Sequence, residues 1–189
     1  IQAQNARLVA LDKTVFDLEK LPATLSQAQV SNWVSTLSKP PTRALYDESG
    51  IEVSAAARDV LQQAIQTDAI PTAVTARYGL VVHRTALRAF PTELRVFSTR
   101  GDTDIDRFQE SALFPGTPVA IAHQSRDGKW LWVVSPRYKA WVARQDIAEG
   151  SREQVLAYAA KAPYRVVLGA KIATVFTREQ PQLSELQLD

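Results

Sequence analysis

Hydrophobic and polar residues alternate along the stretch 116–148 with the two-residue period that is typical of β-strands. The alternation runs through residues 129–135 and 138–143, and a further run around Val119 precedes them. An Asp-Gly pair at 127–128 predicts a tight hairpin turn, because glycine tolerates positive φ. The pattern therefore predicts a small antiparallel barrel, and barrels of this kind often bind ligands.

Hydrophobic residues on the N-terminal side of this barrel recur with the 3.6-residue period of helices. Residues 26–37 predict one helix and residues 54–66 a second, with Ser54 as its N-cap. A further helix is expected from Ser151, which forms a capping-box pattern with Gln154. The apolar side of the second helix is expected to comprise Val60, Leu61, Ala64 and Ile65.

A long irregular loop interrupts the predicted barrel. The strand predicted over residues 78–84 is followed by a loop over 93–109, and loops of this length inside a compact domain are often functional. The loop carries three aspartates, Asp102, Asp104 and Asp106. They could favour a hard cation, but the spacing lacks the glycine and the bidentate glutamate of a calcium loop. We therefore predict no metal site, and interpret the acidic loop as solvated or shaped by an aspartate that accepts backbone N–H groups.

The order of these elements predicts an α+β fold in three parts. Residues 1–76 form a small helical unit that packs on the barrel of residues 77–150, and residues 151–189 follow as a linker helix with two more strands. These strands, predicted over 164–168 and 171–176, correspond to the beginning of a second barrel. The chain starts without methionine, which we interpret as a processed or excised product.

Composition limits the possible functions of the chain. It has 189 residues, 46% of them hydrophobic, a formal charge of +2 and no cysteine. The excess of positive charge is too small to predict binding of nucleic acid. No apolar run approaches the length that spans a membrane. His83 and His123 are interpreted as ordinary strand residues, Ser125 lacks the turn and the orienting acid of a serine hydrolase, and no cofactor is predicted.

Three segments of the sequence carry a family resemblance: RYGLVVHRTALRAFPT, DTDIDRFQESALFPGTPVAIAHQSRDGKWLWVVS and RYKAWVA. They resemble the first bacterial SH3-like (SH3b) domain of the NlpC-type cell-wall cysteine peptidases. Residues 1–72, with VFDLEKLP and LYDESG, are similar to the helical stabilising domain at the N-terminus of those enzymes, and residues 164–189 to the opening of a second SH3-like barrel. One departure is Ala140-Trp141, where the family usually has Gly-Trp.

The resemblance implies an accessory role in the cell envelope, either periplasmic or secreted. Such peptidases cleave the peptidoglycan stem peptide between γ-D-glutamate and the diamino acid, and use a cysteine nucleophile. Because this chain has no cysteine, we predict no catalytic residue in it. Its expected partners are peptidoglycan or a muropeptide and a downstream catalytic domain of the same polypeptide. The alternative is a stand-alone SH3-like module that binds a protein or peptide.

Aromatic and charged residues of the barrel are the predicted ligand site. Tyr138, with one of the paired tryptophans of residues 129–135, is expected to line a groove beside the 93–109 loop. Arginine would bind a ligand carboxylate and the loop aspartates an amine. For the tryptophans, packing in the core is an equally weighted alternative. The predicted residues are Tyr138, Trp130, Trp132, Trp141, Arg88, Asp104 and Asp106.

Overall fold

The computed structural model divides the chain into two compact units, Ile1–Ala159 and Ala160–Asp189. The helical segment 1–76 and the barrel segment 77–150 both lie within the first unit. The second unit contains the hairpin of β10 (Ile172–Val175) and β11 (Leu183–Leu186). The residues described by the structure are 2–12, 14–163, 168, 172–175 and 183–186.

Three helices of the first unit begin at a serine N-cap, and the caps Ser54 and Ser151 are predicted from the sequence. Ser26 accepts a hydrogen bond from the Gln29 backbone N–H, and Ser54 caps the next helix in the same way. Ser151 and Gln154 form the predicted capping box. The helices are α1 (Gln2–Leu11), α2 (Gln27–Leu37), α3 (Ala55–Ala64) and α4 (Arg152–Leu156), with the 3₁₀ turns η1 (Thr67–Ala69), η2 (Arg144–Asp146) and η3 (Tyr158–Ala160).

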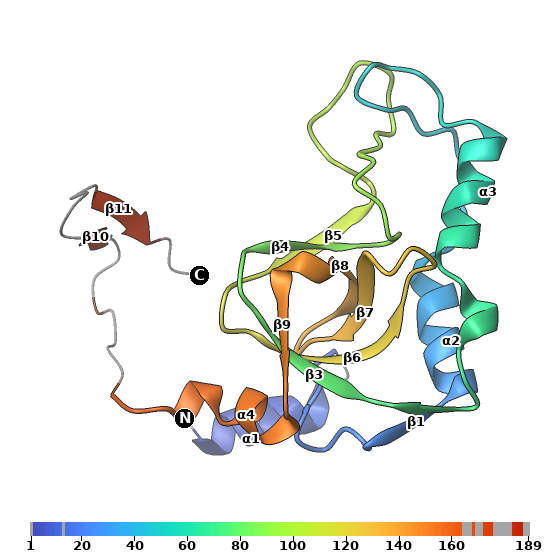
Figure 1. Ribbon diagram of the computed structural model, residues 1–189. Helices are drawn as coiled ribbons and strands as arrows, with labels where there is room; N and C mark the ends of the chain where they lie inside the picture. The colour runs from blue at the N-terminus through green and yellow to red at the C-terminus, as the bar shows by residue number, and fades with distance from the viewer. Residues whose placement is uncertain (1, 13, 164–167, 169–171, 176–182, 187–189) are drawn as a thin grey trace. The chain divides into compact units, whose positions relative to one another are not determined.

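Seven antiparallel strands form the main sheet, in the order β5-β4-β8-β7-β6-β3-β9 (Figure 1). A separate pair, β1 (Thr24–Ser26) and β2 (Ala73–Thr75), joins the start of α2 to the segment that enters the sheet. The strands of the main sheet are β3 (Arg77–Val81), β4 (Thr85–Arg88), β5 (Gln109–Leu113), β6 (Pro118–Gln124), β7 (Trp130–Val134), β8 (Lys139–Ala143) and β9 (Ile147–Gly150).

One face of this sheet encloses an aliphatic core. The core draws residues from all seven strands, which requires the sheet to curl in the manner of an SH3-like barrel. β7 contributes Leu131 and Val133 to this core, as the alternating pattern predicts. The predicted α+β fold with an SH3-like β unit is confirmed. The core comprises Val81, Leu87, Leu113, Val119, Ile121, Leu131, Val133, Ala140, Val142 and Ile147.

The opposite face of the sheet is covered by the helices. Trp130 and Trp132 of β7 pack there with Val30 and Val34 of α2 and with Leu61 of α3. A strand that is buried on both faces has no solvent face, and every residue of β7 is buried. The helical segment therefore covers the face of the sheet that lies opposite the aliphatic core (Figure 1).

Four details of the chain differ from the pattern-based expectations. Val60 is 63% exposed, because the buried stripe of α3 runs through Leu61 and continues to Ile65. The strand predicted over 78–84 ends at Val81, so His83 lies outside it. α1 and β5 were not predicted, since their segments lack a clear period. The strand predicted over 164–168 lies almost entirely outside the described residues, whereas β10 falls within the one predicted over 171–176.

Gly79 marks the closest approach between strands. A Cβ atom at this position would lie 2.5 Å from Ile147 Cγ2 and 3.1 Å from the Ala148 carbonyl oxygen of β9. We expect Gly79→Ala to lower the free energy of unfolding by about 1–3 kcal/mol, because the added methyl group would overpack the contact between β3 and β9. Denaturant unfolding measures this. Gly150→Ala is the control, because its Cβ would first meet the flexible end of Gln154, at 3.3 Å; an equal loss in both variants would contradict the prediction.

Candidate functional site

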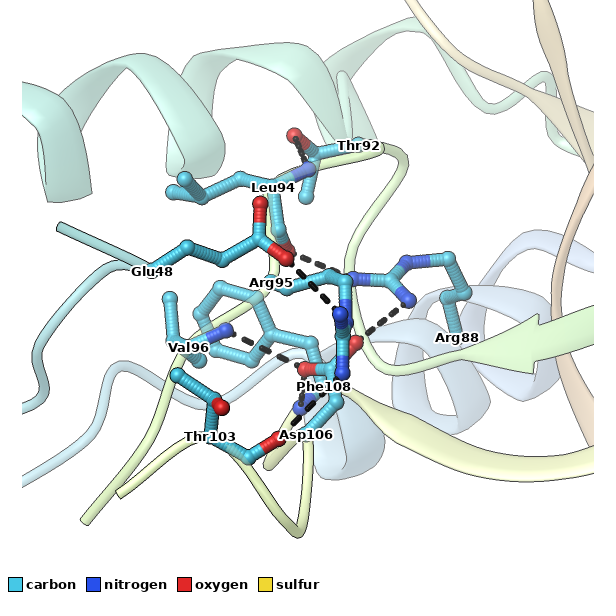
Figure 2. Close-up of polar contacts among 9 residues, drawn as sticks. All are labelled: Glu48, Arg88, Thr92, Leu94, Arg95, Val96, Thr103, Asp106 and Phe108. Carbon is cyan, nitrogen blue, oxygen red and sulfur yellow. Dashed lines mark hydrogen bonds and ion pairs between the residues drawn. The ribbon is translucent and has the colours of Figure 1, made fainter. Parts of the chain in front are cut away.

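A buried ion pair anchors the long loop between β4 and β5. Arg88 Nη1 donates to Asp106 Oδ2 at 2.9 Å, and both side chains are 5% exposed. The guanidinium also donates to the Leu94 carbonyl, while Asp106 Oδ1 accepts the backbone N–H groups of Val96 and Phe108 (Figure 2). The pair therefore fixes the two ends of the loop on one another.

This arrangement changes the interpretation of the charged residues predicted to bind ligand. Arg88 and Asp106 neutralise each other beneath the surface and shape the loop. For Asp106 this matches the sequence alternative of an aspartate that accepts backbone N–H groups, whereas Arg88 was predicted only to bind ligand. Asp104 lies exposed in the loop, where its backbone N–H donates to Asp102. Farther out, Arg95 bonds to Glu48 at 2.7 Å and ties the loop to the helical segment (Figure 2).

Of the tryptophans predicted to line a groove, Trp132 and Trp141 are core residues, whereas the largely buried Trp130 also lines a cleft of about 570 Å³ with Glu93 of the long loop. Trp132 and Trp141 are fully buried, and Trp130 is 7% exposed. Trp132 and Trp141 face each other across β7 and β8 with their ring centroids 5.5 Å apart. Trp141 Nε1 donates to Ser38 Oγ at 3.1 Å, which joins the sheet to the end of α2. These indoles pack against the helices rather than inside the barrel.

Tyr138 and Trp132 are the predicted residues that line a cleft between the helical segment and the barrel. The cleft has a volume of about 340 Å³ and lies between the helical segment and the turn that joins β7 to β8. Trp132 stands in its wall, although its own surface is covered, and its Nε1 has no acceptor among the described residues. The side chains that matter for its chemistry are Phe16, Trp33, Trp132, Arg137, Tyr138 and Lys139.

The phenol of Tyr138, which lines this cleft, is held by the carboxylate of Glu110, a residue that lines a separate cleft with Phe90 and Arg107. The Tyr138 hydroxyl donates to Glu110 Oε2 at 2.6 Å. Ser135 positions the residue, because its hydroxyl donates to the Tyr138 carbonyl and accepts the Tyr138 N–H. Burial and the hydrogen bond to Glu110 raise the pKa of Tyr138 to about 12. The phenol therefore remains a neutral donor at physiological pH.

The Tyr138 titration gives a direct check of this contact. The pKa of Tyr138 in the fold is raised above its ordinary value of 10.0, so its stabilising effect is complete below about pH 10 and is lost as the pH rises toward 12. We expect Glu110→Gln to lower the pKa of Tyr138 toward 10, although burial still keeps it above that value. Ultraviolet absorbance titration, with Tyr138→Phe as the reference, measures this; an unchanged pKa would contradict the contact.

Five residues of this site were not predicted as ligand groups: Phe16, Trp33, Glu110, Arg137 and Lys139. Trp33 lies in the periodic segment that forms α2, where the pattern favours a core position, yet its side chain is half-buried. Glu110 lies in β5, which has no alternating pattern. Phe16 and Lys139 meet only in three dimensions, 123 positions apart. A charged residue at the start of an otherwise apolar strand is the signal that marks Lys139.

His123 has a structural role. His123 Nε2 lies 2.9 Å from the Ile65 carbonyl, and burial lowers the pKa of His123, so the neutral imidazole holds the end of α3.

In the part of the chain that the structure describes, no group of three His, Cys, Asp or Glu side chains is arranged to hold a metal ion. Among the described helices, none is both long and apolar enough to cross a lipid bilayer.

Comparison with known proteins identifies the barrel. Residues 95–143 match the family model of the SH3 domain of the SH3b1 type. The chain therefore carries an SH3b domain, and Glu110, Tyr138 and Lys139 lie within the matched range. No curated protein matches the chain.

A solved structure described as a novel NlpC/P60 endopeptidase from Photobacterium damselae subsp. piscicida is similar to the chain as a whole. The TM-score is 0.65 at 18% sequence identity, over 90% of this chain and 41% of the other. The chain thus spans about two fifths of that relative's length. The similarity shows a shared fold that includes the helical segment as well as the barrel.

Proposed function

We propose that this chain is the non-catalytic part of an NlpC-type cell-wall endopeptidase that recognises the peptidoglycan stem peptide and completes the substrate pocket. The observation that carries the proposal is the aromatic cleft, in which the hydroxyl of the lining residue Tyr138 donates to Glu110. The SH3b domain and the fold shared with an NlpC/P60 endopeptidase support it.

The groups at the cleft match the chemistry of a stem peptide. Such a peptide offers amide groups, an amine and carboxylates. Glu110 uses one oxygen for Tyr138 and keeps the other for a ligand amine, a charge-assisted contact. The half-buried ring of Trp33 offers an apolar face on which the peptide can pack.

Cleavage is assigned to another part of the same polypeptide. The chain has no cysteine, and the peptidases that it resembles need a cysteine nucleophile. In the proposed arrangement, a downstream catalytic domain cuts the bond between γ-D-glutamate and the diamino acid, while this segment holds the peptide. Peptidoglycan is the ligand, and the cell envelope, periplasmic or secreted, is the location.

Calorimetric titration with the peptide L-alanyl-γ-D-glutamyl-diamino acid tests the proposal. We expect saturable binding by the wild-type chain, and about tenfold weaker binding by Glu110→Gln, because a hydrogen bond to a charged group is lost. Asp104→Asn is the matched control, since that carboxylate is exposed on the loop and away from the cleft, and its binding should equal that of the wild type. Absence of binding to the wild-type chain would overturn the proposal.

A further inference from the structure

Lys139 occupies an unusual position at the start of β8. Its ammonium nitrogen lies 4.0 Å from the ring centroid of Phe16 and 4.5 Å from that of Trp33. Two aromatic faces therefore hold the cation by cation–π attraction. They fix its position in the wall of the cleft, between the helical segment and the barrel.

The positive charge of Lys139 has no anionic partner among the described residues. Its ammonium group forms no ion pair or hydrogen bond with a described carboxylate. Burial is the cause that lowers the pKa of Lys139. The nearby carboxylates are engaged elsewhere, Asp17 with Lys20 at 2.9 Å and Glu110 with Tyr138. Arg137, which is exposed at the same cleft, likewise forms no ion pair with a described carboxylate.

An ammonium group held by aromatic faces keeps its hydrogen-bond donors for another acceptor. Aromatic rings attract the cation but provide no lone pair, whereas an ammonium group has three N–H donors. A half-buried cation is stabilised most by an anion that also accepts hydrogen bonds. The wall formed by Arg137 and Lys139 therefore suits a carboxylate.

We propose that Lys139, assisted by Arg137, binds a free carboxylate group of the stem peptide. This inference deepens the proposed function and rests on it for the identity of the ligand. It gives the peptide two charged contacts: Glu110, which lies outside the lining of the cleft and binds the hydroxyl of Tyr138, takes the amine, and Lys139 in the cleft wall takes the carboxylate. The cleft then selects a zwitterionic peptide over one whose carboxylates are blocked.

Paired titrations with two probes separate this inference from the proposed function. The probes are L-alanyl-γ-D-glutamyl-diamino acid with free carboxylates and the same peptide with its carboxylates amidated. We expect the wild-type chain to bind the amidated peptide about tenfold more weakly, because a charge-assisted hydrogen bond is lost. Equal binding of the two peptides would overturn the inference alone, and binding of neither would overturn the proposed function with it.

Variants of Lys139 distinguish ligand binding from a merely structural role. Lys139→Gln should bind both peptides with similar, weak affinity, whereas Lys139→Arg, which keeps the charge, should retain the preference for free carboxylates. Lys129→Gln is the control, because this lysine lies at the opposite end of β7. Thermal unfolding of each variant reports whether the fold is kept. If Lys139→Gln is folded and still prefers the free peptide, the assignment is wrong.

Discussion

Replacing Trp141 by alanine is expected to lower the free energy of unfolding of the first unit by about 3–5 kcal/mol, the range for removing a buried aromatic side chain. Trp141 is fully buried between β8 and α2, so the loss of its ring leaves a cavity in the core that joins the helices to the sheet. It also removes the hydrogen bond to Ser38. Guanidinium unfolding followed by circular dichroism measures the change.

The control for this variant is Val60→Ala on the exposed side of α3. Val60 is 63% exposed, so its truncation should change stability by no more than about 0.5 kcal/mol. If Trp141 instead lined an open groove, its replacement would have a similarly small effect, and the assignment of this residue to the core would fail.

Replacing Asp106 by asparagine is expected to have an effect of the same size, about 3–5 kcal/mol. The substitution keeps the shape of the side chain but leaves the buried guanidinium of Arg88 without its counter-charge. Arg88 Nε already lacks a partner among the described residues, so the site has little capacity to compensate. The same denaturant experiment measures the loss.

Asp104→Asn, two positions away in the same loop, is the matched control. Asp104 is exposed and is expected to change stability by less than about 0.5 kcal/mol. Because both aspartates were predicted as ligand groups from sequence, the pair of variants separates the buried aspartate that shapes the loop from the exposed one that does not. Equal stability of the two variants would contradict the buried ion pair.

The strands could be predicted from sequence because their pattern is local. Alternation in residues 129–135 correctly places Trp130 and Trp132 on one face of the strand and Leu131 and Val133 on the other. It does not show what covers each face, since a two-residue period is the same whether a face meets solvent or another layer. That information comes from α2 and α3, whose apolar stripes cover the tryptophans.

The site was harder to predict because its contacts join distant parts of the chain. Trp141 and Ser38 are 103 positions apart, and Tyr138 and Glu110 are 28 apart. A single sequence gives no measure of such pairings. Tyr138 was predicted by its residue type and its place at the end of the barrel, whereas Glu110 depends on the register of β5, a strand without a pattern.

An NMR titration of the tryptophan indole N–H signals with the stem peptide tests the proposed function most directly. The chain has four tryptophans, which act as reporters at known places. We expect saturable shifts of Trp33 at the cleft and of Trp132 in its wall, and no shift of Trp141, which is buried and bonded to Ser38. Signals that do not move at high peptide concentration, or shifts confined to Trp130, would contradict recognition of the stem peptide at this cleft.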